Sequence, residues 1–215
     1  MGAFRQALAE KADGIELDVH GTADGVLVVH HDSTINGREL STLMAREVAE
    51  HVLPGQETIP TLDEVLALVA DRAIVYVEVK ARRVEELVVA CLDRHPAVQT
   101  AVHAFDHRIP VAVRAQRGGT SIGILSYSYP LDMDAVIRAA RPDALWQFAP
   151  LIDDAIMRDA HRHGARVIAW TENDPVHAHH LMQLGVDGLC TDIPGELRAA
   201  LLAMCEPDRA VRRVQ

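Results

Sequence analysis

The sequence predicts an α/β fold, a TIM-type (β/α) barrel in which seven of eight strands are recognisable and the first strand is missing. Short apolar runs alternate with helical periodicity almost to the end of the 215 residues. This alternation is typical of parallel strands joined by right-handed crossovers. Most runs are apolar on both faces, as strands covered by helices are. No glycine-rich phosphate-binding loop follows any run, so a barrel is favoured over a nucleotide-binding sheet.

The expected elements follow one another in order. Strands are predicted at Gly14–Val19, Ile74–Lys80, Ala101–Phe105, Ser121–Ser126, Ala144–Phe148, Arg166–Thr171 and Gly188–Thr191. Helices are predicted at Leu62–Ala70, Val84–Arg94, Ile109–Arg117, Asp132–Ala140, Asp153–His163 and Pro175–Leu184. Before the first strand, Phe4, Leu8 and Ala12 form one apolar stripe, which indicates the end of an amphipathic helix.

Residues 20–60 form a predicted loop insertion after the first recognisable strand. The turn at Asp24-Gly25 is a hairpin signal, and the apolar run Val26–Val29 then ends in His30-His31-Asp32. Loops on the C-terminal side of barrel strands build active sites. We therefore expect this insertion to carry His31 to the site.

Composition limits the class of protein. The chain is 49% hydrophobic, enough to bury a full core as a single domain over residues 1–215. A net charge of -10 without a basic tract excludes a typical nucleic-acid binder. No apolar stretch approaches the ~20 residues that span a bilayer. Three cysteines without CxxC spacing suggest a reducing compartment, so a cytoplasmic location is expected.

Two carboxylates at the first strand form the strongest local signal. Glu16 and Asp18 are two residues apart, so they share one face of the strand. Neighbouring carboxylates repel each other and raise each other's pKa unless a cation neutralises them. An all-oxygen pair suits a hard ion such as Mg²⁺ or Ca²⁺. Solvated acids at a polar strand end are the alternative.

Three further positions could serve the same site. Glu78 and Lys80 share a face at the end of their strand, where a lysine could contact a phosphate, or the two could form a surface ion pair. His31 is a candidate general acid or base, while His30 alternates to the opposite face. Trp170 could wall a pocket for an alkyl or choline-like group, or belong to the core.

In order, the segments GIELDVHGTADGVLVVHHD, VYVEVK, VHAFD, VIAWTEND and GVDGLCTDIP make the chain resemble glycerophosphodiester phosphodiesterases. The resemblance implies metal-dependent hydrolysis of glycerophosphodiesters to sn-glycerol 3-phosphate and an alcohol. By position it implies Glu16, Asp18 and Glu78 as ligands of Ca²⁺ or Mg²⁺. It also implies His31 as one of two catalytic histidines and Lys80 as a phosphate contact.

The chain departs from the family pattern at its start, where the family has a His-Arg-Gly strand with the second histidine. We expect a truncated N-terminus, with roughly 20–25 residues upstream that could include a signal. Activity could then be impaired, and a non-catalytic phosphodiester-binding or assembly protein is the alternative function. Strand edges left open could also pair with another chain, so an oligomer is possible.

Overall fold

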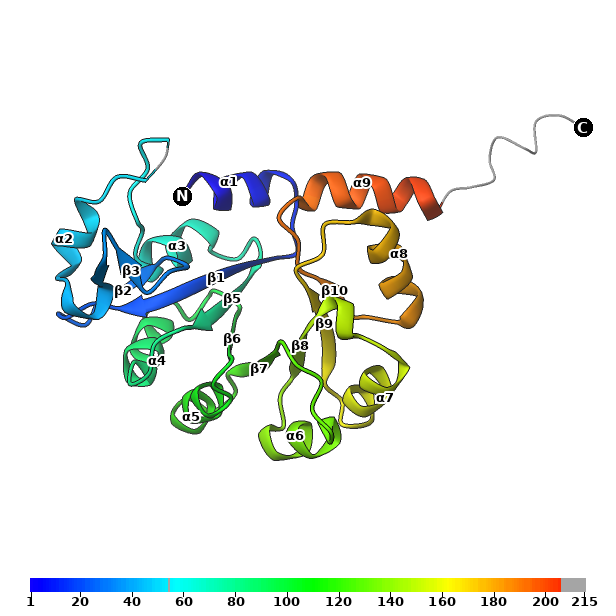
Figure 1. The fold of residues 1–215 in the computed structure, drawn as a ribbon. Helices are drawn as coiled ribbons and strands as arrows, with labels where there is room; N and C mark the ends of the chain where they lie inside the picture. Colours follow the sequence, from blue (N-terminus) through cyan, green and yellow to red (C-terminus); the bar gives the residue numbers. More distant parts are fainter. Residues whose placement is uncertain (54, 206–215) are drawn as a thin grey trace, which may run out of the picture. The chain divides into compact units, whose positions relative to one another are not determined.

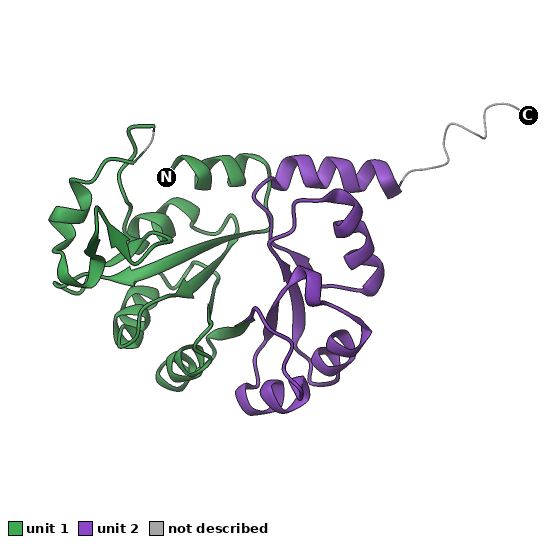
Figure 2. Ribbon diagram, viewed as in Figure 1, with its two compact units in different colours: residues 1–125 green, residues 126–215 purple. Residues whose placement is uncertain are grey.

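The computed structural model describes residues 1–53 and 55–205, and the chain divides into two compact units. Unit 1 is Met1–Leu125 and unit 2 is Ser126–Gln215, as Figure 2 shows by colour. Each unit repeats the predicted strand–helix alternation, which can be followed along the chain in Figure 1. None of the described helices is long and apolar enough to cross a membrane.

Unit 1 contains the predicted insertion and four of the predicted strands. Its helices are α1 (Gly2–Ala9), α2 (Ala45–Ala49), α3 (Leu62–Val69), α4 (Glu85–Arg94) and α5 (Arg108–Gln116). Its strands are β1 (Gly14–Gly21), β2 (Leu27–Val29), β3 (Thr34–Ile35), β4 (Arg38–Glu39), β5 (Ile74–Val79), β6 (Thr100–Ala104) and β7 (Ser121–Ser126), the last of which ends on the first residue of unit 2.

The sheet of unit 1 has the order β2, β1, β5, β6, β7. Strands β1, β5, β6 and β7 run parallel, and β2 is antiparallel to the end of β1. A close approach of β1 to β5 requires glycine at position 14, because a Cβ there would lie 2.5 Å from the ring of Tyr76. This approach sets the register in which Gly14 lies opposite Ile74.

Apolar side chains from the sheet and from helices α3 and α4 form the core of unit 1. Fully buried members include Val19, Val75, Val77, Leu62, Val65, Leu66, Val69 and Val88. Each buried side chain of this size contributes about 1.5–3 kcal/mol to folding. Thr61 and Glu64 form a capping box at the start of α3, which aligns the helix with this core. The core therefore fixes the strands whose ends carry the polar residues.

The insertion has a small core of its own. Val28, Ile35, Leu40, Leu43, Val48 and Ile59 are buried together. The hairpin turn is closed by Thr22, whose amide donates to the carbonyl of Val26, and by Gly25, whose φ of +79° favours glycine. Strand β2 ends at Val29, whereas the predicted alternation of His30 and His31 assumed that the strand continues through them. Both histidines follow the strand, although the amide of His30 still donates to the carbonyl of Asp18 on β1.

Unit 2 contains the three remaining predicted strands. Its helices are α6 (Met133–Ala140), α7 (Asp154–Arg162), α8 (Pro175–Leu184) and α9 (Pro194–Cys205), and its parallel strands are β8 (Ala144–Phe148), β9 (Arg166–Trp170) and β10 (Gly188–Leu189). Asp153 caps α7 by accepting from the amides of Ala155 and Ile156. Asp174 caps α8, and Gly185 ends that helix in the left-handed conformation.

Candidate active site

Three adjacent parallel strands of unit 1 bring acidic side chains and an imidazole into one row. The register places Asp18 of β1 opposite Glu78 of β5, and Glu78 opposite His103 of β6. Glu16 lies two residues before Asp18 and so shares its face of β1. The row lies near the C-terminal ends of β5 and β6. In α/β folds this is the end of the strands where ligands bind.

Lys80 is the cation within this row. Its Nζ lies 2.8 Å from Oε1 of Glu78 and 3.1 Å from Oδ1 of Asp18. The side chains of Lys80, Asp18 and Glu78 are only 21%, 17% and 8% exposed, so water screens these pairs incompletely. One ammonium group therefore serves two carboxylates, and Glu16 adds a third negative group beside them.

The pKa values express this excess of negative charge. Burial, and then the charge of Asp18, raise the pKa of Glu16 from 4.5 to about 8. Burial also raises the pKa of Glu78. Burial lowers the pKa of Lys80, but its hydrogen bond to Glu78 and the charges of Glu78 and Asp18 outweigh that effect and raise it overall. The carboxylates would be relieved by a further positive charge.

His103, which the sequence analysis did not single out, completes the row. It is 1% exposed, and its Nε2 lies 3.2 Å from Oε1 of Glu16. Burial lowers its pKa to about 4, which keeps the imidazole neutral. Strand alternation alone predicts only which face of β6 carries His103. Only the register between β5 and β6 brings it beside Glu78, and no local pattern encodes that register.

The donor set fits a divalent cation. Ligand atoms of Glu16, Glu78 and His103 all lie within 4.8 Å of one another. Carboxylate oxygens are the ligands of Mg²⁺ and Ca²⁺, and a neutral imidazole is a ligand of transition metals. Asp18, expected from the sequence as a third ligand, has its carboxylate bound to Lys80 at the edge of this group.

Three histidines lie around the β1–β2 hairpin: His20 near the end of β1, and His30 and His31 after β2. The imidazole of His31 is 77% exposed, and its Nδ1 lies 2.8 Å from Oδ1 of Asp32. His31 is nevertheless near enough to Glu16 for its charge to lower that residue's pKa. The Nδ1 of His30 hydrogen-bonds with the carbonyl of Asp32. His20 is buried, and its Nε2 lies 3.3 Å from the carbonyl of His31.

Trp170 belongs to an aromatic cluster in unit 2. Its indole Nε1 donates to the carbonyl of Trp146 at 2.9 Å. Its ring lies 5.9 Å from the ring of Phe148 and 5.8 Å from that of Tyr127, measured between centroids. Tyr127 is 61% exposed, so the cluster presents aromatic surface to solvent. This surface could accept an apolar or cationic group.

The chain is similar to known proteins along most of its length. The model of the glycerophosphoryl diester phosphodiesterase family matches residues 1–196. The chain is 32% identical to "Probable glycerophosphodiester phosphodiesterase 2" of Mycobacterium tuberculosis, over 98% of this chain and 87% of that protein.

Two solved structures share the fold. A glycerophosphodiester phosphodiesterase from Parabacteroides distasonis superposes with a TM-score of 0.84 at 23% identity, over 94% of this chain and 89% of that one. A phosphodiesterase from Oleispira antarctica, in complex with the product sn-glycerol-3-phosphate, gives 0.82 at 21% identity, over 92% and 88%. These likenesses confirm the predicted α/β fold of the TIM-barrel type. The match over most of the chain means that this protein belongs to the glycerophosphoryl diester phosphodiesterase family of phosphoric diester hydrolases.

Proposed function

We propose that the protein hydrolyses glycerophosphodiesters to sn-glycerol 3-phosphate and an alcohol, with a divalent cation, Mg²⁺ or Ca²⁺, bound by Glu16, Asp18 and Glu78. The observation that carries the proposal is the crowding of carboxylates at these strand ends, where the one ammonium of Lys80 is shared by Asp18 and Glu78. Family membership supports the reaction. The product bound to the Oleispira antarctica phosphodiesterase supports the substrate class.

The cation, when bound, would polarise the phosphate and offset its charge. The three carboxylates would hold that ion, which in turn would relieve their mutual repulsion. Lys80 would then be free to contact a phosphate oxygen with its ammonium group. Its Nζ lies 5.8 Å from the ring centroid of Phe105, a contact that helps to hold the side chain in place.

Hydrolysis breaks the bond between phosphorus and the alcohol oxygen, and water supplies the oxygen of the new bond. The departing oxygen must gain a proton, and we assign that donation to His31. An imidazole titrates near neutral pH and can supply it. The exposed position of His31 beside Asp32 supports this role, since Asp32 can orient the ring through Nδ1.

Trp170 is proposed as a contact for the alcohol group of the substrate. Its support lies within unit 2, where Trp170, Phe148 and the exposed Tyr127 form the aromatic cluster described above. A choline group would gain from such aromatic faces through cation–π attraction. Trp170→Ala should then raise KM for glycerophosphocholine more than KM for glycerophosphoglycerol.

The test is an assay of the purified full chain with glycerophosphocholine. Release of sn-glycerol 3-phosphate should require Mg²⁺ or Ca²⁺, stop with excess chelator and return when the ion is restored. Glu78→Gln serves as the matched control, because it keeps the size of the side chain and removes its charge. Binding of the diester without turnover in either ion would contradict the proposal and favour a non-catalytic phosphodiester-binding protein.

A further inference from the structure

The described residues contain two groups of three side chains whose ligand atoms lie within 4.8 Å of one another. One group is Asp63, Cys91 and His95 on α3, α4 and the end of α4. Its carboxylate is already satisfied, because Arg94 donates to both oxygens of Asp63 at 3.1 and 2.6 Å. Arg94 therefore supplies the positive charge that an ion would otherwise bring, and this group needs no ligand.

The other group is Glu16, Glu78 and His103, where the ammonium of Lys80 pairs with Glu78 but is shared with Asp18. Each side chain comes from a different strand of one sheet, so the backbone ladder holds all three in place. Exposure falls from 28% at Glu16 to 8% at Glu78 and 1% at His103. An ion entering from solvent would thus meet oxygen first and nitrogen last.

We propose that His103 supplies a nitrogen ligand to the cation of this site, which raises the affinity of the site for a transition ion relative to its affinity for Ca²⁺. The inference rests on the proposed function, because it takes the carboxylate row as a cation site. It adds a nitrogen donor to the carboxylate oxygens of that site. Imidazole nitrogen is a ligand of transition ions, among which Zn²⁺ binds more strongly than Mn²⁺, whereas Ca²⁺ takes oxygen ligands.

The spacing of the donor atoms supports the assignment. Nε2 of His103 and Oε1 of Glu16 are 3.2 Å apart, so both atoms could face one ion. Ligand atoms of His103, Glu16 and Glu78 all lie within 4.8 Å of one another, so the imidazole can join the carboxylates around one ion.

The alternative is a hydrogen bond between His103 and Glu16 with no role for the imidazole in binding an ion. Activity alone cannot separate the two, since either variant could slow turnover. The direct measurement is electron spin-echo modulation of Mn²⁺ bound to the full chain. A coordinated imidazole produces nitrogen modulation, which changes in a known way when histidine carries the heavy nitrogen isotope.

We expect nitrogen modulation in the wild-type protein, its isotope change with labelled histidine, and its loss in His103→Gln. The glutamine can still donate to Glu16, so the packing is preserved while the nitrogen ligand is removed. Affinity for Mn²⁺ should fall about 10-fold in this variant while affinity for Ca²⁺ changes little. His31→Gln and His95→Gln should keep the modulation. This result would exclude His31, which lies near Glu16, and His95, which belongs to the Asp63 group, as its source.

Mn²⁺ that binds without nitrogen modulation would overturn the inference, and ion-dependent hydrolysis by the same sample would leave the proposed function standing. Modulation that survives in His103→Gln would also overturn it. A chain that binds no divalent ion at all would defeat both. If His103→Gln does not fold, the isotope comparison in the wild-type protein, read with the two control variants, still decides the matter.

Discussion

Two buried glutamates, one in each unit, differ in what surrounds them. The side chain of Glu78 in unit 1 is 8% exposed and that of Glu172 in unit 2 is 7% exposed. Oε1 of Glu172 accepts from the amide of Asp174 at 2.7 Å, and its Oε2 pairs with Nδ1 of His177. Glu78 instead shares Lys80 with Asp18. The carboxylate of Glu172 therefore stabilises the loop that supplies its donors. The carboxylate of Glu78 shares its counter-ion with Asp18 and is better suited to bind a ligand.

The comparison predicts its largest effect for the pair Glu78→Gln and Glu172→Gln. Glu78→Gln removes a proposed ligand and should lower kcat/KM for glycerophosphocholine about 10³-fold, which corresponds to about 4 kcal/mol. Glu172→Gln weakens the contact with His177 and should lower thermal stability while kcat/KM changes by less than about 10-fold. Steady-state kinetics and thermal unfolding on both variants test this. Equal losses of activity would mean that the contrast between the two sites is false.

The second prediction concerns the histidines that follow β2. His31→Ala should lower kcat about 10²-fold, the usual effect of losing a general acid. Its affinity for Mn²⁺ should stay within about twofold of wild type, because the ring of His31 is 77% exposed and pairs with Asp32. His30→Ala is the matched control and should change kcat only a few-fold. A larger loss in His30→Ala would assign the proton donor to His30.

These two predictions differ in how far the sequence could support them. Glu16 and Asp18 could be paired from sequence because strand alternation acts over two residues. The seven strands of the alternating pattern could also be placed, since apolar runs of this length are typical of buried strands. The residue at which β2 ends could not be predicted from the sequence, because it depends on contacts with other segments of the chain. Val29 donates its amide to Pro60 and His30 donates its amide to Asp18.

His103 shows a deeper limit. Its place beside Glu78 depends on the register of two strands that helix α4 separates, and it follows from how that helix packs on the sheet. Lys80 shows the same limit in another form. The sequence suggested a phosphate contact, but its ion pair with Asp18 joins β1 to the end of β5 and requires the folded sheet.

A third prediction uses the pH dependence of stability in the metal-free protein. The folded pKa of Glu16, about 8, lies above its ordinary value of 4.5, so the folded state binds a proton more tightly than the unfolded state. Its contribution is therefore fully present below pH 4.5 and is lost as pH rises to about 8. Partial exposure of the side chain reduces the loss to about 2 kcal/mol.

Denaturant unfolding between these two pH values measures the effect. Glu16→Gln should remove most of the decline, because its amide resembles the protonated acid. Addition of Mn²⁺ to the wild-type protein at pH 8 should restore the stability, since the ion replaces the proton. His103 acts in the opposite direction at lower pH, because its folded pKa of about 4 lies below 6.5. A decline that persists in Glu16→Gln would point to Glu78, whose pKa is also raised.

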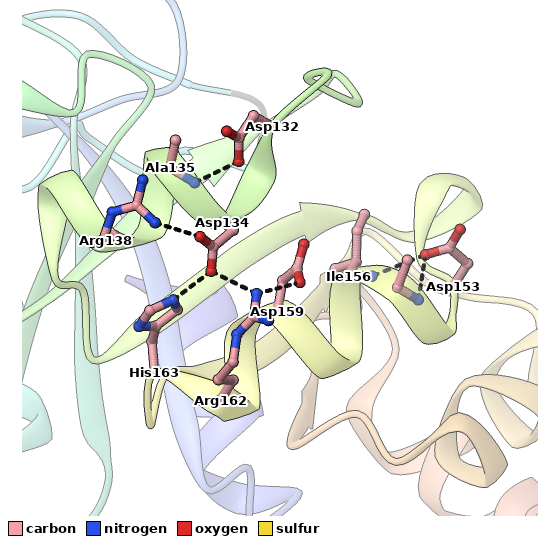
Figure 3. Close-up of polar contacts among 10 residues, drawn as sticks. Asp132, Asp134, Ala135, Arg138, Asp153, Ile156, Asp159, Arg162 and His163 are labelled. Atoms are coloured by element: carbon pink, nitrogen blue, oxygen red, sulfur yellow. Dashed lines mark hydrogen bonds and ion pairs between the residues drawn. The ribbon is translucent and has the colours of Figure 1, made fainter.

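The smallest effect of a substitution is expected at Asp134 on α6 of unit 2, because several cations already pair with this carboxylate. Asp134 on α6 accepts from Arg138 at 2.5 Å, and from Arg162 and His163 at 2.6 Å each, as Figure 3 shows. The hydrogen bond from His163 is the main cause that lowers the pKa of Asp134. The arginines are 62% and 60% exposed, so solvent screens their pairs.

Asp134→Asn should therefore lower Tm by only about 1–3 °C at low salt, and by less in 1 M NaCl, where the screening length is about 3 Å. Asp132→Asn is the matched control. Asp132 caps α6 by accepting from the amide of Ala135 at 2.8 Å, and asparagine caps a helix about as well as aspartate. Its Tm should not change at either salt concentration. Turnover should be unaffected in both variants, and a loss of kcat in Asp134→Asn would show that this ion-pair cluster does more than join α6 to α7.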